Sequence, residues 1–407
     1  MGTPVRRLSL GIVLAAVAST LTLGLLQKSP CASGEWPDLK QNRLLCYSDL
    51  VPLYGTEQLK GDRLPFLDDC HPTVFRPCDQ YPVLTMYTMR LAAWPVDSFS
   101  GFFYANAFFL IVAGGVTAVA LHRMVGARAL YFALAPSLIV YAFLNWDLLA
   151  VALATGATLA FLHKRDTASG ILLGLGAATK FYPVLFVVPF AAERLRTGDK
   201  KGALKVAGWT LASWAVVNLP FIVLAQDAWS FFFRLNADRG ADWDSLWLIG
   251  CDRLQSGACL DVGAVNLLSF VVFLGASAIL CGLRLWRDPD TPRWQLAFPI
   301  LIAFLLSNKV YSPQYSLWLL PWFPLVLPDW RLFLAFSLSD VAVFVTRFAF
   351  FGHLDAPSGY WFSPFTFGFF EIAIVIRAAI LVGCLIVFVL RAPESPRAGL
   401  REELVAA

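Results

Sequence analysis

Charged and amide side chains stand inside or directly beside apolar stretches at several points of this 407-residue sequence. A charge at the centre of a membrane span costs about 2.5–3.5 kcal/mol on insertion scales, so such residues usually mark a functional site. The order of the apolar stretches predicts that most of these residues gather at one face of a membrane. The candidates are Asp49, Glu57, Asp147, Lys180, Arg239, Asp242, Asp244, Lys309 and Gln314.

Carboxylates and cations together suit the transfer of a group from a phosphate to a hydroxyl. A carboxylate can take the proton from the attacking hydroxyl. Lys and Arg can neutralise the departing phosphate, on which negative charge develops in the transition state. ATP and nucleotide sugars are confined to the cytoplasm, so a transferase that faces the other side must use a donor carried by a lipid. The residue types indicate this chemistry without identifying a sugar.

The composition is that of a membrane protein. Apolar residues make up 58% of the chain, charged residues 15%, and the mean hydropathy is +0.64. A globular domain has roughly 45–50% apolar and about 25% charged residues. These values exclude a nucleic-acid-binding protein, a disordered chain and a small disulfide-stapled module. The net charge of +4 is too small to indicate a polyanionic partner.

Apolar runs predict an all-α polytopic fold with about twelve transmembrane helices of about 20 residues each. The first run is longer than the 7–15-residue core of a signal peptide, which favours a retained anchor. The two runs on either side of Lys180 are each too short to cross the membrane, and they predict a broken hairpin. The runs are 8–26, 102–121, 129–144, 148–162, 169–179, 181–192, 203–224, 264–283, 294–307, 315–328, 332–351 and 367–390.

The apolar runs and the polar segments between them predict one integral membrane domain, residues 1–390, which is followed by a tail at 391–407. Lys and Arg crowd into the short loops on one side, which is typical of the cytoplasmic face. Both termini are therefore predicted to be cytoplasmic, in a plasma membrane. Residues 27–98 and 225–263 then form two extracytoplasmic loops.

Six of the eight cysteines lie in these two long loops. On the extracytoplasmic side disulfides persist, so we expect bridges, with unpaired thiols as the alternative. The four cysteines of the first loop allow three pairings, between which the sequence does not choose. No cysteine and histidine cluster has the spacing of a metal site. The loop cysteines are Cys31, Cys46, Cys70, Cys78, Cys251 and Cys259.

Other classes of protein explain the sequence less well. There is no phosphate-binding glycine loop, dinucleotide fingerprint or zinc-protease motif, which argues against an ATP-driven pump or a zinc protease. A transporter or lipid flippase would share the broken hairpin and the intramembrane charges. It would also show an internal repeat, which is not detectable here. Single residues have plainer explanations, since Lys180 can extend to the interface and Tyr182-Pro183 can simply end a helix.

Six short motifs occur in an order that resembles glycosyltransferase family 87, in the GT-C superfamily of polyprenyl-phosphate-sugar-dependent membrane transferases. Two positions depart from the family's pattern, Val83 for a second proline and Asp244 for a glutamate, and the four first-loop cysteines are not typical of it. The motifs are Asp49 to Tyr54, Tyr81 to Leu84, Asn145 to Asp147, Thr179 to Pro183, Arg239-Gly240 with Asp244 to Trp247, and Asn308 to Tyr315 with Trp318 to Pro321.

The resemblance implies about a dozen helices, with a first extracytoplasmic loop that carries short membrane-surface helices over a donor cavity. It also implies an inverting transfer in which Asp49 is the general base, with Glu57 and Asp147 as alternatives. By the same matching, the donor phosphate is held by Lys309 and Gln314, with Arg239 and Lys180. Tyr81, Asp244 and His353, the last in a late outer loop, are further candidates.

Characterised actinobacterial relatives of the family transfer mannose or arabinose from a polyprenyl phosphate. The resemblance therefore implies a polyprenyl-phosphate sugar, most often mannose, as donor and a lipid-linked or polysaccharide acceptor of the cell envelope. Asp68-Asp69 is not the Asp-x-Asp that some GT-C enzymes use with a metal, so we expect activity without a metal or another cofactor. Arabinofuranosyl transfer, and a degenerate member that binds the donor without transferring it, remain alternatives.

Overall fold

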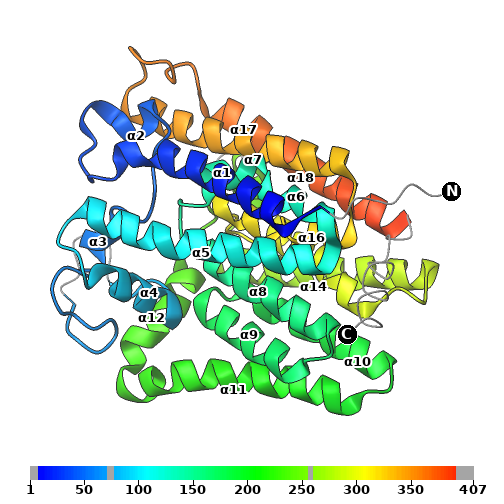
Figure 1. The fold of residues 1–407 in the computed structure, drawn as a ribbon. Helices are drawn as coiled ribbons and strands as arrows, with labels where there is room; N and C mark the ends of the chain where they lie inside the picture. The colour runs from blue at the N-terminus through cyan, green and yellow to red at the C-terminus, as the bar shows by residue number, and fades with distance from the viewer. Residues whose placement is uncertain (1–7, 71–77, 255–259, 391–407) are drawn as a thin grey trace.

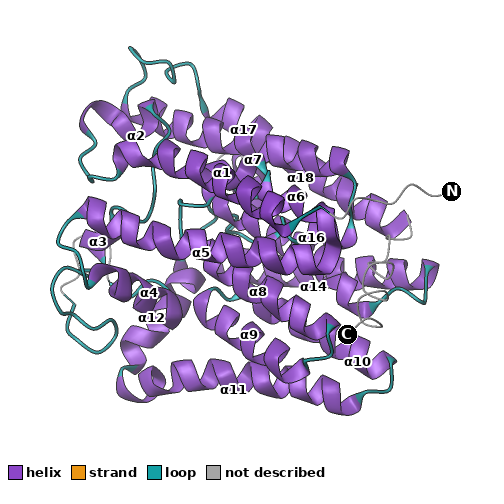
Figure 2. Ribbon diagram, in the orientation of Figure 1, coloured by secondary structure: helices purple, strands orange, loops and turns teal. Residues whose placement is uncertain are grey.

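The computed structural model describes residues 8–70, 78–254 and 260–390. Within these ranges all regular secondary structure is helical, as Figure 2 shows, and the predicted all-α class is confirmed. Six helices are long and apolar enough to cross a membrane. They are α1 (Leu10–Lys28), α5 (Phe99–Val125), α11 (Lys200–Leu224), α14 (Val262–Arg287), α17 (Trp330–Asp355) and α18 (Phe367–Leu390).

The other apolar runs form shorter helices, several of them interrupted. Three of these pieces, α7, η4 and η6, have proline at the first or second position, because proline fits the first turn of a helix but not its interior. The predicted count of about twelve spans therefore stays a prediction. The pieces are η3 (Gly126–Ala129), α6 (Leu130–Ala133), α7 (Pro136–Tyr141), α8 (Asp147–Leu162), α9 (Asp166–Thr179), η4 (Tyr182–Phe186), α10 (Val187–Arg196), η5 (Arg293–Leu296), α15 (Ala297–Ser307), η6 (Pro313–Trp318) and α16 (Trp322–Val326).

The predicted break in the hairpin occurs at Lys180. This residue is extended, with φ −151° and ψ 132°, and it separates α9 from the short 3-10 helix η4. Pro183 in η4 packs on Gly176, where an added Cβ would lie 3.0 Å from the proline ring. The break turns the Lys180 side chain toward the start of α8, whose Asp147 it contacts.

The longer helices of the bundle pack side by side in layers. In Figure 1, α11, α9, α8, α5, α1 and α17 follow one another from the bottom of the view to the top. Small residues allow the closest approach: a Cβ at Gly170 of α9 would lie 2.7 Å from the carbonyl oxygen of Val206 in α11. Such small-residue contacts are a common basis of helix association in membranes.

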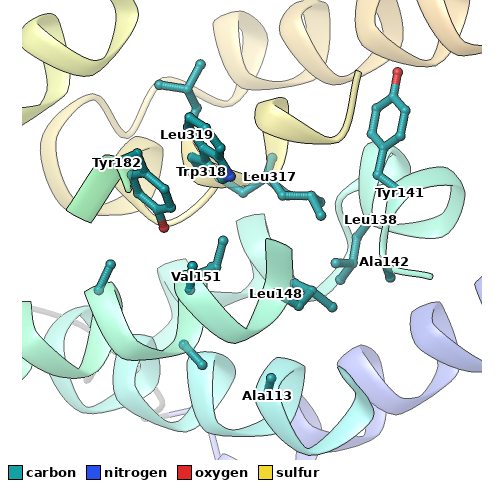
Figure 3. Packing of buried hydrophobic residues seen from close by; sticks show 14 of the residues in the cluster. Ala113, Leu138, Tyr141, Ala142, Leu148, Val151, Tyr182, Leu317, Trp318 and Leu319 are labelled. Carbon is teal, nitrogen blue, oxygen red and sulfur yellow. The ribbon is translucent and has the colours of Figure 1, made fainter. Parts of the chain in front are cut away.

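Aromatic residues fill the core between α8 and η6. Figure 3 shows Tyr182 lying against Trp318, above Leu148 and Val151 of α8 and Ala113 of α5. The rings of Tyr182 and Trp318 are parallel to within 9°, with centroids 4.2 Å apart. This stacking joins the interrupted hairpin to the segment that contains Lys309 and Gln314.

Both long loops carry short helices, and in Figure 1 these lie at the left end of the bundle, away from the α10–α11 connection. Loop 1 (residues 27–98) is structured, as predicted, although 71–77 lie outside the described residues. It contains η1 (Ser29–Cys31), η2 (Pro37–Leu39), α2 (Lys40–Arg43), α3 (Leu53–Thr56) and α4 (Val83–Ala93). Loop 2 (residues 225–263) contains α12 (Gln226–Asp238) and α13 (Leu246–Leu254). The predicted tail at 391–407 lies outside the described residues.

Disulfides join the loop-1 cysteines in one of the three possible pairings, Cys31 with Cys46 and Cys70 with Cys78. In loop 2, Cys251 is disulfide-bonded, and Cys259 lies outside the described residues. The two cysteines of the apolar helices, Cys281 and Cys384, are free.

Candidate functional site

Asp49 lies where loop 1 meets the helical bundle. Its backbone N–H donates to the carbonyl of Leu144 across 2.9 Å, and the hydroxyl of the preceding Ser48 donates to the Phe143 carbonyl across 2.6 Å. The Tyr47 hydroxyl donates to one carboxylate oxygen at 2.8 Å, and the Asn145 side chain donates to the other at 2.9 Å. Asp49 is half-buried. The carboxylate is thus oriented by two neutral donors and can still accept a proton.

The turn between α7 and α8 holds this arrangement together, because three consecutive side chains bind three different elements. Asn145 donates to Asp49 and to the Tyr81 hydroxyl oxygen, each across 2.9 Å. The indole of Trp146 donates to Asn106 of α5 across 2.7 Å. Asp147, the first residue of α8, accepts hydrogen bonds from Trp318 of η6 and from Lys180 after α9. The sequence motif Asn145 to Asp147 therefore works as a local hub.

Asp147 is fully buried, and both of its carboxylate oxygens are occupied. The Trp318 indole N–H donates to one oxygen at 2.7 Å, and the Lys180 ammonium donates to the other at 3.2 Å. Lys180 also lies over the rings of Tyr81 and Tyr315, 5.7 and 5.2 Å from their centroids. Asp147 is therefore a worse-placed base than Asp49, and its charge is neutralised by Lys180.

Loop 2 approaches the same region through Lys309. The Lys309 ammonium donates to the backbone carbonyls of Ala237 and Arg239, at 3.0 and 2.5 Å. The backbone N–H of Asp242 donates in return to the Lys309 carbonyl across 2.8 Å. Burial lowers the pKa of Lys309, and the nearby charge of Arg239 lowers it further. Lys309 thus fastens the end of α12 to the α15–η6 connection.

Arg239 is the more accessible cation here, with 38% of its side chain exposed, and it pairs with Asp242 at 3.4 Å. Gln314 lies buried in η6, one residue before Tyr315, whose ring stacks on Trp318 with centroids 4.1 Å apart. The charges of Lys180, Asp147, Arg239 and Asp242 all act on Tyr315. Lys180, from the broken hairpin, and Arg239, from loop 2, therefore both act on Tyr315.

A buried network of charged residues connects loop 2 to α17 and α18. Asp244 is the only one of its members that the sequence analysis named as a candidate. Asp244 pairs with Arg347 of α17, and its backbone carbonyl accepts from Arg377 of α18 at 3.5 Å. Arg377 also pairs with Asp340 at 3.3 Å and lies 3.8 Å from the ring centre of Tyr311. Burial raises the pKa of Asp244 to about 6, although both arginines oppose the shift.

Arg347 is the member of this network on which the charge of Asp49 acts. The charges of Asp242 and Asp49 act on it in addition to that of Asp244. The sequence signal that could have identified it is an isolated charge within an apolar run, the same signal that pointed to Lys180.

Glu57 belongs to a separate network inside loop 1. It accepts the backbone N–H of Asp79 at 2.6 Å, and Asp79 pairs with Arg63 at 2.6 Å. Glu57 is fully buried. Burial raises the pKa of Glu57 to about 7, with the charge of Asp79 adding to the shift. Glu57 thus stabilises the loop when it is protonated.

His353 does not lie in a loop, contrary to the sequence-based expectation. It occupies the last turn of α17, which continues to Asp355 because the apolar and aromatic residues before it keep the helix packed. Its Nδ1 is 2.6 Å from the Ser363 carbonyl. Among the described residues, no group of three or more His, Cys, Asp or Glu side chains could hold a metal ion.

A small cavity of about 10 Å³, lined mainly by apolar and aromatic residues, lies next to Tyr81. Loop 1, the α9–η4 junction, α11 and α12 each contribute to its wall, through Phe66, Phe181, Trp214 and Phe233. The Asn218 side chain within it accepts the Trp229 indole N–H across 2.9 Å. Tyr81 lines this cavity, and its hydroxyl accepts from Asn145, which links the cavity to the Asn145–Asp49 contact.

Comparison with known families decides the classification. The profile of glycosyltransferase family 87 matches residues 81–313, more than half of the chain. The chain belongs to glycosyltransferase family 87. The matched range includes the Asn145 hub, Lys180, Arg239 and Lys309, and it begins after Asp49. The resemblance recognised from the motifs is confirmed, and this family 87 protein is a multi-pass membrane glycosyltransferase.

Two solved structures are similar to it at low sequence identity. ArnT from Cupriavidus metallidurans bound to undecaprenyl phosphate has a TM-score of 0.46 and 15% identity, over 94% of this chain and 77% of that one. The apo oligosaccharyltransferase of Archaeoglobus fulgidus has a TM-score of 0.46 and 13% identity, over 93% of this chain and 55% of that one. No curated protein matches the sequence.

Proposed function

We propose that this protein is an inverting glycosyltransferase that moves a sugar from a polyprenyl phosphate to a hydroxyl of a cell-envelope glycolipid or polysaccharide. The proposed sugar is mannose, and the proposed side is the extracytoplasmic face. One observation carries the proposal: the half-buried Asp49 carboxylate is held by the neutral donors Tyr47 and Asn145, and Asn145 also donates to Tyr81, over whose ring the Lys180 ammonium lies. The proposed base and the proposed phosphate-binding cation Lys180 are thus linked through Asn145 and Tyr81.

In the proposed reaction, the acceptor hydroxyl oxygen attacks the anomeric carbon from the side opposite the phosphate. The bond from that carbon to the phosphate oxygen breaks, and Asp49 takes the hydroxyl proton. The products are the glycoside with inverted configuration and the free polyprenyl phosphate. General-base catalysis of this kind contributes typically 10²–10⁴-fold to a rate.

The cations stabilise the leaving phosphate, which gains negative charge as the bond breaks. Arg239 is accessible enough to contact it directly. Lys180 lies over the rings of Tyr81 and Tyr315, and its charge is partly neutralised by Asp147. Lys309 fixes the backbone that carries Arg239, and Gln314 directly precedes Tyr315 in η6.

The aromatic surroundings of Tyr81 support a lipid-carried donor, because apolar and aromatic side chains are suitable neighbours of an isoprenoid chain. The loop disulfides support the extracytoplasmic face, since such bridges persist in oxidising compartments. We also propose that turnover needs no metal. Chelation by EDTA should then leave the rate unchanged, and recovery of activity only on adding a divalent cation would contradict this.

The deciding experiment is sugar transfer by the purified protein in detergent. Polyprenyl-phosphate-mannose and polyprenyl-phosphate-arabinose are each offered with an envelope glycolipid extract, and Asp49→Ala and Asp49→Asn are assayed in parallel. We expect product from the mannose donor, loss of at least 10²-fold in both variants, and donor binding close to that of the wild type.

Other outcomes point elsewhere. Product from the arabinose donor alone would change the sugar but keep the reaction. Tight donor binding without product would indicate a binding protein or a transporter. Retained turnover in the Asp49 variants would move the base to Asp147 or Glu57.

A further inference from the structure

Two short connections meet at the end of the bundle that lies away from the long loops, toward the right in Figure 1. They are residues 163–165, between α8 and α9, and residues 197–199, between α10 and α11. A Cβ at Gly202 of α11 would lie 2.6 Å from a carboxylate oxygen of Asp166, the first residue of α9. A Cβ at Gly170 of α9 would lie 3.1 Å from the Lys205 carbonyl oxygen. The first turns of α9 and α11 therefore lie side by side.

The acidic residues of this region are already bound within the fold. Asp166 pairs with Arg194 across 2.7 Å, and Glu193 pairs with Arg196 across 2.6 Å. Asp199 accepts a backbone N–H of the first turn of α11 across 2.8 Å. Each of these carboxylates thus has a partner in the protein itself.

Five further cations of the region are exposed, and within the described part of the chain none of them forms an ion pair. They are Lys164, Arg165, Lys200, Lys201 and Lys205. An excess of Lys and Arg in short connections is typical of the cytoplasmic face, but that preference does not require the charges of different connections to be adjacent. Here the packing of α9 on α11 brings the cations of two connections together. The result is a positive surface that attracts an anion.

Beyond these cations, the outer face of α11 becomes apolar. One exposed stripe of this helix consists of residues three or four positions apart, which lie on the same face: Lys201, Lys205, Trp209, Ala212 and Val216. Trp209 stands between the cations and the apolar part, and tryptophan is enriched where a membrane meets water. Only 17% of the apolar window of α11 is buried inside the protein, so this face is open to lipid. The stripe thus presents positive charge, an aromatic ring and apolar surface in succession.

We propose that Lys164, Arg165, Lys201, Lys205 and Trp209 form a binding site for an anionic phospholipid, with its phosphate at the cations and an acyl chain along the apolar part of α11. This set of residues is called the α9–α11 lipid site below. Lys and Arg bind phosphate through charge-assisted hydrogen bonds, and basic clusters next to a membrane helix bind anionic headgroups. A zwitterionic lipid gains less, because its own positive charge is repelled. The inference is independent of the proposed transfer reaction.

The test uses the purified protein in detergent, titrated with mixed micelles of dioleoyl-phosphatidylglycerol or dioleoyl-phosphatidylcholine, whose acyl chains are identical. Native mass spectrometry counts the bound lipids, and thermal unfolding measures the stabilisation that binding brings. We expect the anionic lipid to bind at least 10-fold more tightly and to raise the unfolding temperature more. A Lys or Arg near an anionic headgroup contributes about fivefold in affinity. Lys201→Gln combined with Lys205→Gln should therefore weaken binding of the anionic lipid by about 10- to 30-fold.

Matched variants separate the site from the total charge of the protein. Arg287→Gln combined with Arg331→Gln removes the same charge from two exposed arginines, at the end of α14 and the start of α17, and should leave lipid binding close to that of the wild type. Lys201→Arg combined with Lys205→Arg keeps the charge and should keep the affinity. Trp209→Ala should weaken both lipids alike. All these side chains are exposed, so the unfolding temperature without lipid should stay near that of the wild type.

Three results would overturn the proposal. Equal affinity for the two lipids in the wild type would show that the cations do not select a headgroup. An equal loss in the Arg287 and Arg331 control would mean that the total charge, and not this surface, attracts the lipid. Inorganic phosphate, offered at the same phosphate concentration, should not stabilise the protein, because it lacks the chain that contacts α11. Stabilisation as large as that by the anionic lipid would assign the surface to a free anion instead.

Discussion

The side-chain amide of Asn145 lies 2.9 Å from the Asp49 carboxylate, so a residue of the turn before α8 orients a residue 96 positions earlier. The same amide reaches the Tyr81 hydroxyl oxygen at 2.9 Å. Loop 1 and the helical bundle therefore meet at one side chain. Its removal should affect the orientation of the carboxylate more than donor binding.

For Asn145→Ala we expect kcat to fall about 10- to 100-fold, because a hydrogen bond to a charged group is worth about 1.5–3 kcal/mol. The donor KM should change little. Tyr81→Phe is the control, since it leaves the Asn145–Asp49 bond in place, and its loss should be smaller. Steady-state kinetics of both variants checks this, and a wild-type kcat in Asn145→Ala would contradict it.

Asp147→Ala should reduce stability rather than remove the base. It leaves the Lys180 ammonium and the Trp318 indole N–H without their acceptor. Loss of one partner of a buried pair costs about 3–5 kcal/mol. Thermal unfolding in detergent should show a marked drop, partly recovered by adding Lys180→Met. The comparison is Asp49→Asn, which should unfold near the wild-type temperature. Activity is measured on Asp147→Asn and Asp49→Asn. An inactive Asp147→Asn variant together with an active Asp49→Asn variant would assign the base to Asp147.

Loss of the Cys31–Cys46 bridge should lower both stability and activity. The bridge spans a sequence separation of 15, and a loop of that length corresponds to about 3 kcal/mol in the chain-entropy treatment. It also ties α1 to the Asp49 segment. We therefore expect the double alanine variant to lose kcat and to unfold at a lower temperature.

The Cys70–Cys78 bridge, with a separation of 8, is the matched control. Its removal should leave kcat closer to that of the wild type. A reductant applied to intact cells should likewise weaken the protein by opening loop 1. If neither the cysteine variants nor the reductant changes stability, the disulfides of loop 1 are not structural.

Glu57→Gln should stabilise the protein at alkaline pH. Burial raises the pKa of Glu57 to about 7, so the folded state favours the protonated carboxyl. The stability from this group is full below about pH 4.5, the ordinary value, and is lost as the pH rises through about 7. A glutamine is neutral throughout and can still accept the Asp79 N–H. The gain at pH 8 should be on the order of 1–3 kcal/mol, with little difference at pH 5.

Thermal unfolding at pH 5 and pH 8 measures this difference. Asp68→Asn, another acidic substitution in loop 1, serves as the control, since Asp68 is exposed. Equal stabilities of Glu57→Gln and the wild type at pH 8 would mean that Glu57 is not held protonated in the folded loop.

Much of the site could be predicted from the sequence because its signals are local. Asn145 to Asp147, Lys180 and Lys309 stood out as polar residues beside apolar runs, and the order of their motifs identified the family. Arg347 and Arg377 carry the same signal within apolar runs, and the structure gives them partners in loop 2 and α17.

The sequence by itself determined the membrane class, the position of the break at Lys180 and the family, because hydropathy, helix-breaking residues and short motifs are properties of neighbouring residues. Tertiary structure alone decided how the loop-1 cysteines pair, that Asp49 has neutral partners while Asp147 has Lys180, and that the Lys309 ammonium binds backbone carbonyls. These relations join segments far apart in the chain. They depend on how the helices pack, which no local pattern encodes.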